Sequence, residues 1–216
     1  MKLDIDIYLD IQHVWQLDPE NKLPKKDARK ICAIACMKML IDYLPPEKDK
    51  SIKLSEIRSW LIDNNGRNED GNWIHSAQVK YLKEIGYTAW RRNWSVEQKP
   101  QWFLDNEGYS NTQYDNVVSQ INAEEKFDSF NERVKHSLIN AFKNNTPVIT
   151  SVKLGFDSNG HNHQIVLSGY KRDSNGEYFY INDPMNDPDT SKALELIEVE
   201  KFFKYFNHIA VFAKAQ

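Results

Sequence analysis

Residues 32–43 read CAIACMKMLIDY, and the rest of the predicted architecture is built around this segment. At about 100° per residue, Lys38 and Asp42 form the only polar stripe of this segment, and the two cysteines fall opposite it. An apolar surface this wide is typical of a central, buried helix. We therefore predict a helix from about Asp27 to Leu44, ended by the prolines that follow it, with Cys32 near its amino-terminal end.

The segments around this helix predict an antiparallel sheet. Apolar residues alternate with polar ones over residues 5–11, which is the pattern of a half-buried strand. Further helices are expected at 55–63, 75–85, 129–144 and 199–206, and further strands at 147–154, 163–170, 178–182 and 209–213. The strands 163–170 and 178–182 should form a hairpin. The predicted fold class is α+β, with the amino-terminal helix packed on an antiparallel sheet.

The composition allows one sizeable core. The chain has 216 residues, of which 40% are hydrophobic, and we expect a single domain over residues 1–216. Residues 91–127 show no sustained period and are interpreted as an insertion. Aromatic side chains in and beside it either line a substrate groove or anchor the insertion to the core; they are Trp90, Trp94, Trp102, Phe103, Tyr109 and Tyr114.

Several classes of protein are excluded. The net charge is -3 and the basic residues form no long block, so nucleic acid is not expected as a partner. No apolar run approaches the roughly 20 residues that span a bilayer, so no membrane insertion is expected. The first residues lack a secretory signal, which predicts a cytoplasmic protein unless a signal has been removed. Two cysteines four residues apart exclude a disulfide scaffold and a Cys-rich metal site.

The order of three residues indicates thiol chemistry. Cys32 starts a buried helix, His163 opens a strand and Asp183 ends the next strand. A helix amino terminus and a nearby imidazolium both favour a reactive thiolate, and a carboxylate fixes the imidazole tautomer. The backbone amide of Cys32 and the side chain of Gln12 would stabilise the oxyanion. This chemistry requires no cofactor.

Other interpretations of these residues stay open. Cys36, on the helix interior, is expected to be a buried small hydrophobe. His163 could be structural, or His161 and His163 could hold a metal ion with Asp157 or Asp183. Asp183 precedes a proline and could be an ordinary turn residue.

Six segments resemble the bacteriocin-processing cysteine peptidases, family thirty-nine of the papain-like clan. They are the helix 32–43, LSEIR at 54–58, residues 79–86, TPVI at 146–149, HQIVLSGY at 163–170 and INDP at 181–184. The resemblance implies a papain-like fold with Cys32 as the nucleophile. Family exporters fuse this domain to membrane and ATP-binding parts. The chain resembles the free-standing relatives, for which a double-glycine leader substrate is not implied.

The chain departs from the family at three positions. The family has Asp before and Gly after its nucleophile, where this chain has Ile31 and Ala33. The oxyanion Gln of the family also lies closer to the nucleophile than Gln12 does, which makes Gln16 the substitute for that role.

We therefore expect a cysteine peptidase or amidase that hydrolyses a peptide bond in a peptide or protein substrate. Cys32 would attack, His163 would transfer protons, Asp183 would orient His163 and Gln12 would bind the oxyanion. Two alternatives remain. One is a catalytically degenerate peptide-binding module of the same fold, suggested by Ile31 and Ala33, and the other is a thiol acyltransferase, which uses the same acyl-enzyme.

Overall fold

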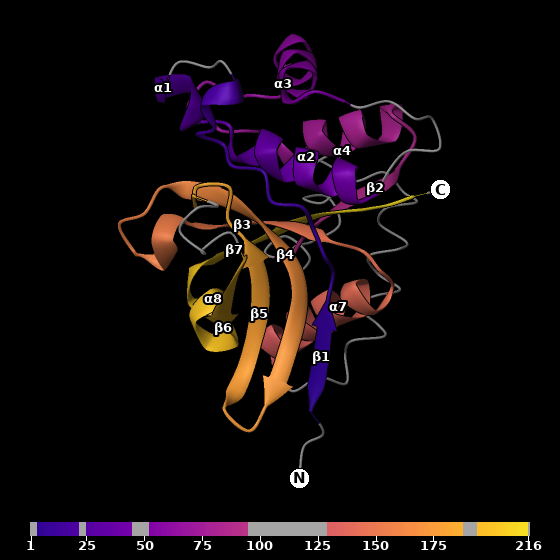
Figure 1. Ribbon diagram of the computed structural model, residues 1–216, viewed down its shortest axis with the longest axis vertical. Helices are drawn as coiled ribbons and strands as arrows, with labels where there is room; N and C mark the ends of the chain where they lie inside the picture. Colours follow the sequence, from indigo (N-terminus) through magenta and orange to yellow (C-terminus); the bar gives the residue numbers. More distant parts are fainter. Residues whose placement is uncertain (1–3, 22–24, 45–51, 95–128, 188–193, 216) are drawn as a thin grey trace, which may run out of the picture.

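The computed structural model describes residues 4–21, 25–44, 52–94, 129–187 and 194–215. Within them, helices gather at one end of the molecule and an antiparallel sheet forms the rest, with two further helices beside the strands (Figure 1). This is the α+β arrangement that the sequence predicts.

Seven strands make the sheet. Six follow the order β2 (Thr88–Asn93), β7 (Phe206–Lys214), β3 (Val148–Lys153), β4 (Asn162–Asp173), β5 (Gly176–Asn182) and β6 (Leu194–Glu198). The seventh, β1 (Ile5–Tyr8), pairs with the second half of β4. Every pairing is antiparallel. The predicted hairpin is confirmed as β4 and β5, which meet across the turn that Asp173 and Gly176 close.

The helices lie at the end and sides of this sheet (Figure 1). They are α1 (Lys25–Ala28), α2 (Cys32–Tyr43), α3 (Leu54–Asp63), α4 (His75–Glu84), α7 (Phe130–Lys143) and α8 (Val199–Tyr205), with short 3-10 turns η1 (Pro19–Asn21) and η2 (Leu154–Phe156). Helix α2 packs on β4 and α3 and is buried along most of its length. Its polar stripe is confirmed, because Lys38 and Asp42 pair at its surface.

The predicted helix 27–44 is wrong in one respect, since it is two helices. The chain leaves helical geometry after Ala28, and α2 begins anew at Cys32. The indole N–H of Trp73 donates to the carbonyl of Lys30 and so occupies an acceptor that a continuous helix would use. The break places Cys32 in the first turn of α2, where backbone N–H groups have no partner within the helix.

The predicted insertion began too early. Residues 91–93 belong to β2, which pairs with β7. Trp90 stacks on Phe212 of β7, with ring centroids 5.3 Å apart, and Trp94 is fully buried against Phe212 and Phe206. These two aromatics therefore anchor the chain to the core. Residues 95–127, with the other aromatics named above, lie outside the described residues. Strand β6 is an element that the sequence analysis missed.

A close approach of two strands holds β1 in place. A Cβ atom built on Gly169 of β4 would lie 2.0 Å from the carbonyl oxygen of Ile7 in β1. Only glycine allows this contact. Because the segment after β1 continues towards the candidate site, Gly169 helps to position that segment.

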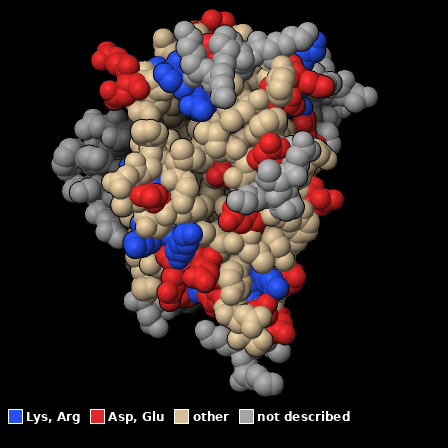
Figure 2. All heavy atoms as spheres, turned by 60° about the vertical axis from the view of Figure 1, so that its left-hand side comes forward, with Lys and Arg blue, Asp and Glu red and all other residues tan. Residues whose placement is uncertain are grey.

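The surface carries both signs of charge. Lys and Arg are interspersed with Asp and Glu on the face drawn in Figure 2. No described helix combines the length and the hydropathy that crossing a membrane requires.

Candidate active site

A cleft of about 1090 Å³ contains the first two predicted residues, Cys32 and His163. Its wall is formed by the amino-terminal ends of α2 and α4 on one side and by β3, β4 and β7 on the other. Trp73 also lines it, so the residue that binds the Lys30 carbonyl just before Cys32 is part of the same wall.

His163 and Asp183 form a buried pair beside this cleft. The Nε2 atom of His163 lies 2.6 Å from Oδ1 of Asp183, and the side chains are 4% and 10% exposed. The same carboxylate oxygen accepts the backbone N–H of Met185 at 2.8 Å. Adjacent strands bring the two residues together, because His163 opens β4 and Asp183 directly follows β5. A carboxylate held in this way orients the imidazole.

Cys32 acts on the same imidazole, because its hydrogen bonding and its charge are among the causes that raise the pKa of His163. Since Asp183 occupies Nε2, Nδ1 is the ring atom left for the sulfur. Burial alone would lower the pKa of His163. The hydrogen bonds and charges of Asp183 and Cys32 outweigh burial and raise that pKa to about 10. The arrangement therefore favours an imidazolium next to a partly exposed sulfur.

The two candidate glutamines differ in placement. Gln12 is exposed, whereas Gln16 is fully buried. The backbone N–H of Gln16 donates to the carbonyl of Pro184 at 2.9 Å, and its Nε2 donates to the carbonyl of Ala28 at 3.1 Å. Gln16 thus links the residue after Asp183 to the segment that leads into Cys32. The side chain of Gln12 makes no comparable contact within the described residues.

Cys36 is buried and structural, as expected. It is fully inaccessible, and its thiol donates to the carbonyl of Gln164 at 3.3 Å. Burial raises its pKa well above the ordinary value of 9.0, and the charges of Cys32 and Asp183 add to this effect. A thiol in this environment is a poor nucleophile.

The sequence analysis did not identify three polar residues of the cleft. His75 at the start of α4, Ser151 on β3 and Gln164 on β4 all line the cleft and contact one another. Gln164 directly follows His163 and could have been noticed for that reason. His75 carries no such local signal, because its partners are about 76 and 89 positions away.

Within the described residues, no group of three or more His, Cys, Asp or Glu side chains is placed to hold a metal ion. His161 lies at the cleft but is exposed, while Nε2 of His163 is bound to Asp183.

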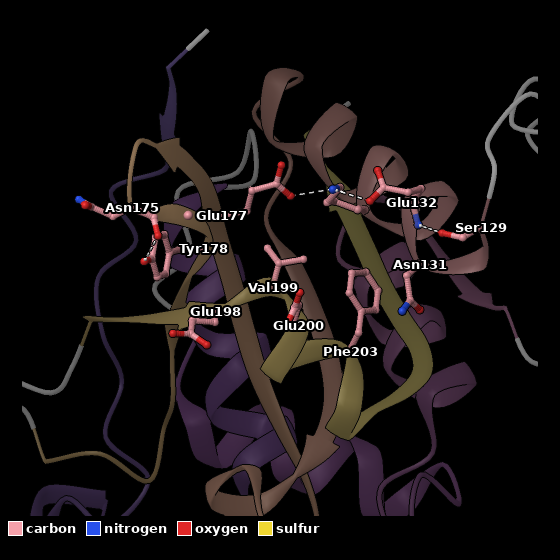
Figure 3. A pocket seen from close by; sticks show the side chains of 12 residues that line it. Ser129, Asn131, Glu132, Asn175, Glu177, Tyr178, Glu198, Val199, Glu200 and Phe203 are labelled. Carbon is pink, nitrogen blue, oxygen red and sulfur yellow. Dashed lines mark hydrogen bonds and ion pairs between the residues drawn. The ribbon is translucent and has the colours of Figure 1, made fainter. Parts of the chain in front are cut away.

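A second cavity of about 440 Å³ lies between α7, α8 and the hairpin of β4 and β5. Figure 3 shows Glu132 and Glu177 pointing towards one another across it, with the Lys135 ammonium bound between them at 2.7 Å from each carboxylate. Burial would lower the pKa of Lys135, but the two carboxylates raise it. The residues described around this cavity include no Cys or His.

Comparison with known proteins agrees with this geometry. The Peptidase_C39 like family matches residues 8–211, so the chain belongs to that family. One solved structure with this fold is a double glycine motif protease from an AMS/PCAT transporter in complex with the leader peptide; it is 17% identical, with a TM-score of 0.51, 99% of this chain covered and 100% of that one. Another, a C39-like peptidase from Bacillus anthracis, is 14% identical, with a TM-score of 0.55 and 99% of each chain covered. No curated protein sequence matches the chain.

Proposed function

We propose that the protein is a cysteine peptidase or amidase that hydrolyses peptide bonds with Cys32, His163 and Asp183. One observation carries the proposal: His163 is paired with the Asp183 carboxylate at 2.6 Å in a cleft that also contains Cys32, at a helix amino terminus, and the charge of Cys32 helps to raise the pKa of His163. Each contact has a role in thiol hydrolysis, and membership of a peptidase family supports the same reaction class.

In the proposed acylation step, the Cys32 thiolate attacks the carbonyl carbon of the scissile bond. The carbonyl electron pair moves to oxygen and forms a tetrahedral oxyanion. When this intermediate collapses, the carbon–nitrogen bond breaks and the His163 imidazolium protonates the leaving amine. The acyl group is then held as a thioester on Cys32.

In the deacylation step, neutral His163 takes a proton from water and the oxygen attacks the thioester carbon. Collapse of the second oxyanion releases the carboxylic acid and restores the thiolate and the imidazolium. Asp183 keeps the ring in the orientation that both steps need, since it binds Nε2 and leaves Nδ1 towards the sulfur.

We assign oxyanion stabilisation to Gln16 with the backbone amide of Cys32, in place of Gln12. Gln16 is buried, and its amide nitrogen donates to the carbonyl of Ala28, four residues before Cys32. Gln12 is exposed. One hydrogen of the Gln16 amide binds Ala28, which leaves the second for an oxyanion. A preorganised buried donor stabilises such a charge far better than a solvated one.

The proposed substrate is a peptide or a segment of a protein. A cleft of about 1090 Å³ is large enough for several residues of an extended chain, and a solved structure of the same fold contains a leader peptide. A double-glycine sequence is not part of the proposal, because that likeness extends to the fold alone.

The test is cleavage of a library of internally quenched peptides by the parental protein and by its Cys32→Ala and His163→Ala variants. The proposal predicts cleavage by the parent and loss of at least about 100-fold in each variant. Equal cleavage by the parent and both variants would overturn it. If the parent binds peptides without cleaving any of them, the degenerate binding module is the correct function.

The same experiment separates hydrolysis from acyl transfer. Mass spectrometry of the products, with an added amine present, shows whether the acyl group ends on water or on the amine. The proposal predicts the free acid as the main product.

A further inference from the structure

Three side chains below the cleft form a directional series of hydrogen bonds, here called the relay: Gln78, Gln164 and His75. Nε2 of Gln78 donates to Oε1 of Gln164 at 3.0 Å, and Nε2 of Gln164 contacts Nε2 of His75 at 3.2 Å. Both glutamines are buried. With the Gln164 amide oriented in this way, its nitrogen donates to Nε2 of His75.

Ser151 acts on the same atom. Its hydroxyl lies 2.8 Å from Nε2 of His75 and can also donate to it. A ring nitrogen that accepts from these two groups carries no proton. Burial and the charge of Arg91 lower the pKa of His75 to about 4, so the ring is neutral at physiological pH. A neutral imidazole without a proton on Nε2 carries it on Nδ1.

The Nδ1 atom of His75 has no hydrogen-bond partner among the described residues. It is also not fully buried, because it is absent from the fully buried polar atoms that have no partner. His75, Ser151 and Gln164 all line the cleft that contains Cys32. In this tautomer Nδ1 of His75, a residue that lines the cleft, is an uncharged N–H donor, and the ring is held by residues on α4, β3 and β4.

We propose that His75 determines specificity by donating from Nδ1 to an oxygen on a substrate side chain, so that the cleft selects Gln or Asn over an apolar side chain of similar length. The inference rests on the proposed function, because it names the substrate class of the same cleft. An acceptor oxygen completes the bonding of Nδ1, whereas an apolar side chain would desolvate that atom and leave it without a partner.

The experiment uses N-capped tripeptide vinyl sulfones, in which Gln, Met or Lys occupies each of the three positions in turn. Met and Gln are both unbranched and similar in length, so the pair isolates the hydrogen bond. The rate at which each compound labels Cys32 is followed by mass spectrometry. At one position, the parental protein should prefer Gln to Met by about 3- to 10-fold, which is the value of one net hydrogen bond.

Three variants make the test specific. His75→Leu should lose the preference for Gln, while His75→Asn, whose amide nitrogen can replace Nδ1, should keep part of it. His161→Leu is the matched control, because His161 is an exposed histidine of the same cleft with no hydrogen bond to the relay. It should keep the preference of the parent.

Several results would overturn the inference. They are equal labelling with Gln and Met at all three positions, retention of the preference in His75→Leu, or preference for Lys, which would mean that Nδ1 accepts. Failure of the proposed function looks different: neither iodoacetamide nor any vinyl sulfone would label Cys32. The imidazole nitrogen chemical shifts of His75 then decide the inference independently, since a proton on Nε2 contradicts it whatever the reactivity of the thiol.

Discussion

Nε2 of His163 and Oδ1 of Asp183 lie 2.6 Å apart, and both side chains are almost completely shielded from solvent. The backbone N–H of Met185 binds the same carboxylate oxygen, so Asp183 cannot turn away from the ring without losing two hydrogen bonds. This pair occupies Nε2 of the imidazole and leaves Nδ1 available for the proposed contact with Cys32.

Two substitutions of Asp183 distinguish the effect of its negative charge from the effect of its hydrogen-bond acceptor. In Asp183→Asn, the amide oxygen can still accept from His163 and Met185, but the negative charge that helps to raise the pKa of His163 to about 10 is gone. When the rate of peptide cleavage is plotted against pH, the fall on the alkaline side should therefore move to lower pH. Asp183→Leu removes the acceptor as well, and activity should fall at least about 100-fold.

Folding of both Asp183 variants is checked by circular dichroism. An unchanged fall on the alkaline side in Asp183→Asn would contradict the role assigned to the carboxylate, as would full activity in Asp183→Leu.

The two glutamines provide a second prediction. Gln16→Ala should lower kcat/KM by about 100-fold or more, because a buried oxyanion donor is lost, without changing the rate at which iodoacetamide alkylates Cys32. Gln12→Ala should leave both rates near those of the parent, since the Gln12 side chain is exposed. The opposite result, with Gln12→Ala as the inactive variant, would restore the original sequence-based assignment.

The contrast between these glutamines shows where sequence reasoning about the site stops. Cys32, His163 and Asp183 follow from order and pattern, because a residue at a helix start and residues at neighbouring strand ends meet by simple geometry. Gln12 and Gln16 lie in an irregular segment without a period. Only the contacts of that segment with Pro184 and Ala28 distinguish them.

Gly169 gives a prediction about stability. Gly169→Ala places a Cβ atom 2.0 Å from the carbonyl of Ile7, so β1 must shift, and the free energy of unfolding should fall by about 2 to 4 kcal/mol. Urea unfolding measures the change.

Ser168→Ala is the matched control for this substitution. It lies next to Gly169 on β4, and its buried hydroxyl has no partner within the described residues, so its removal should change the free energy of unfolding by less than about 1 kcal/mol. Equal stability of Gly169→Ala and the parent would show that β1 does not approach β4 as described.

His75 predicts how stability depends on pH. Its pKa is about 4 in the folded protein and about 6.5 in the unfolded chain. Above pH 6.5 the ring is neutral in both states. Below that pH the unfolded chain takes up the proton first, so the free energy of unfolding falls as the pH drops towards 4.

The measurement compares the parent and His75→Asn by urea unfolding at pH 7 and pH 5. Other groups titrate in this range, but they are common to both proteins. The parent should lose about 2 kcal/mol more than the variant between the two pH values. An equal loss in both proteins would show that His75 is not held neutral.

The fold was predictable where the sequence has a strong period. The polar stripe of Lys38 and Asp42 and the alternation along β4 specify a buried helix and buried strands. The break before Cys32 is accompanied instead by a hydrogen bond from Trp73, more than forty residues away, which no local pattern reveals. Strand β6 was missed because its exposed side chains, such as Leu196, give no clear alternation.

The most direct test of the central claim is the rate of iodoacetamide alkylation against pH, resolved by mass spectrometry into Cys32 and Cys36, in the parental and His163→Ala proteins. We predict that Cys32 of the parent reacts well below the pH at which a free thiol reacts, about 8.5, and loses this advantage without His163. Cys36 should stay slow in both proteins because it is buried. If Cys32 reacts as slowly as Cys36, or equally fast with and without His163, the proposed pairing of thiolate and imidazolium is contradicted.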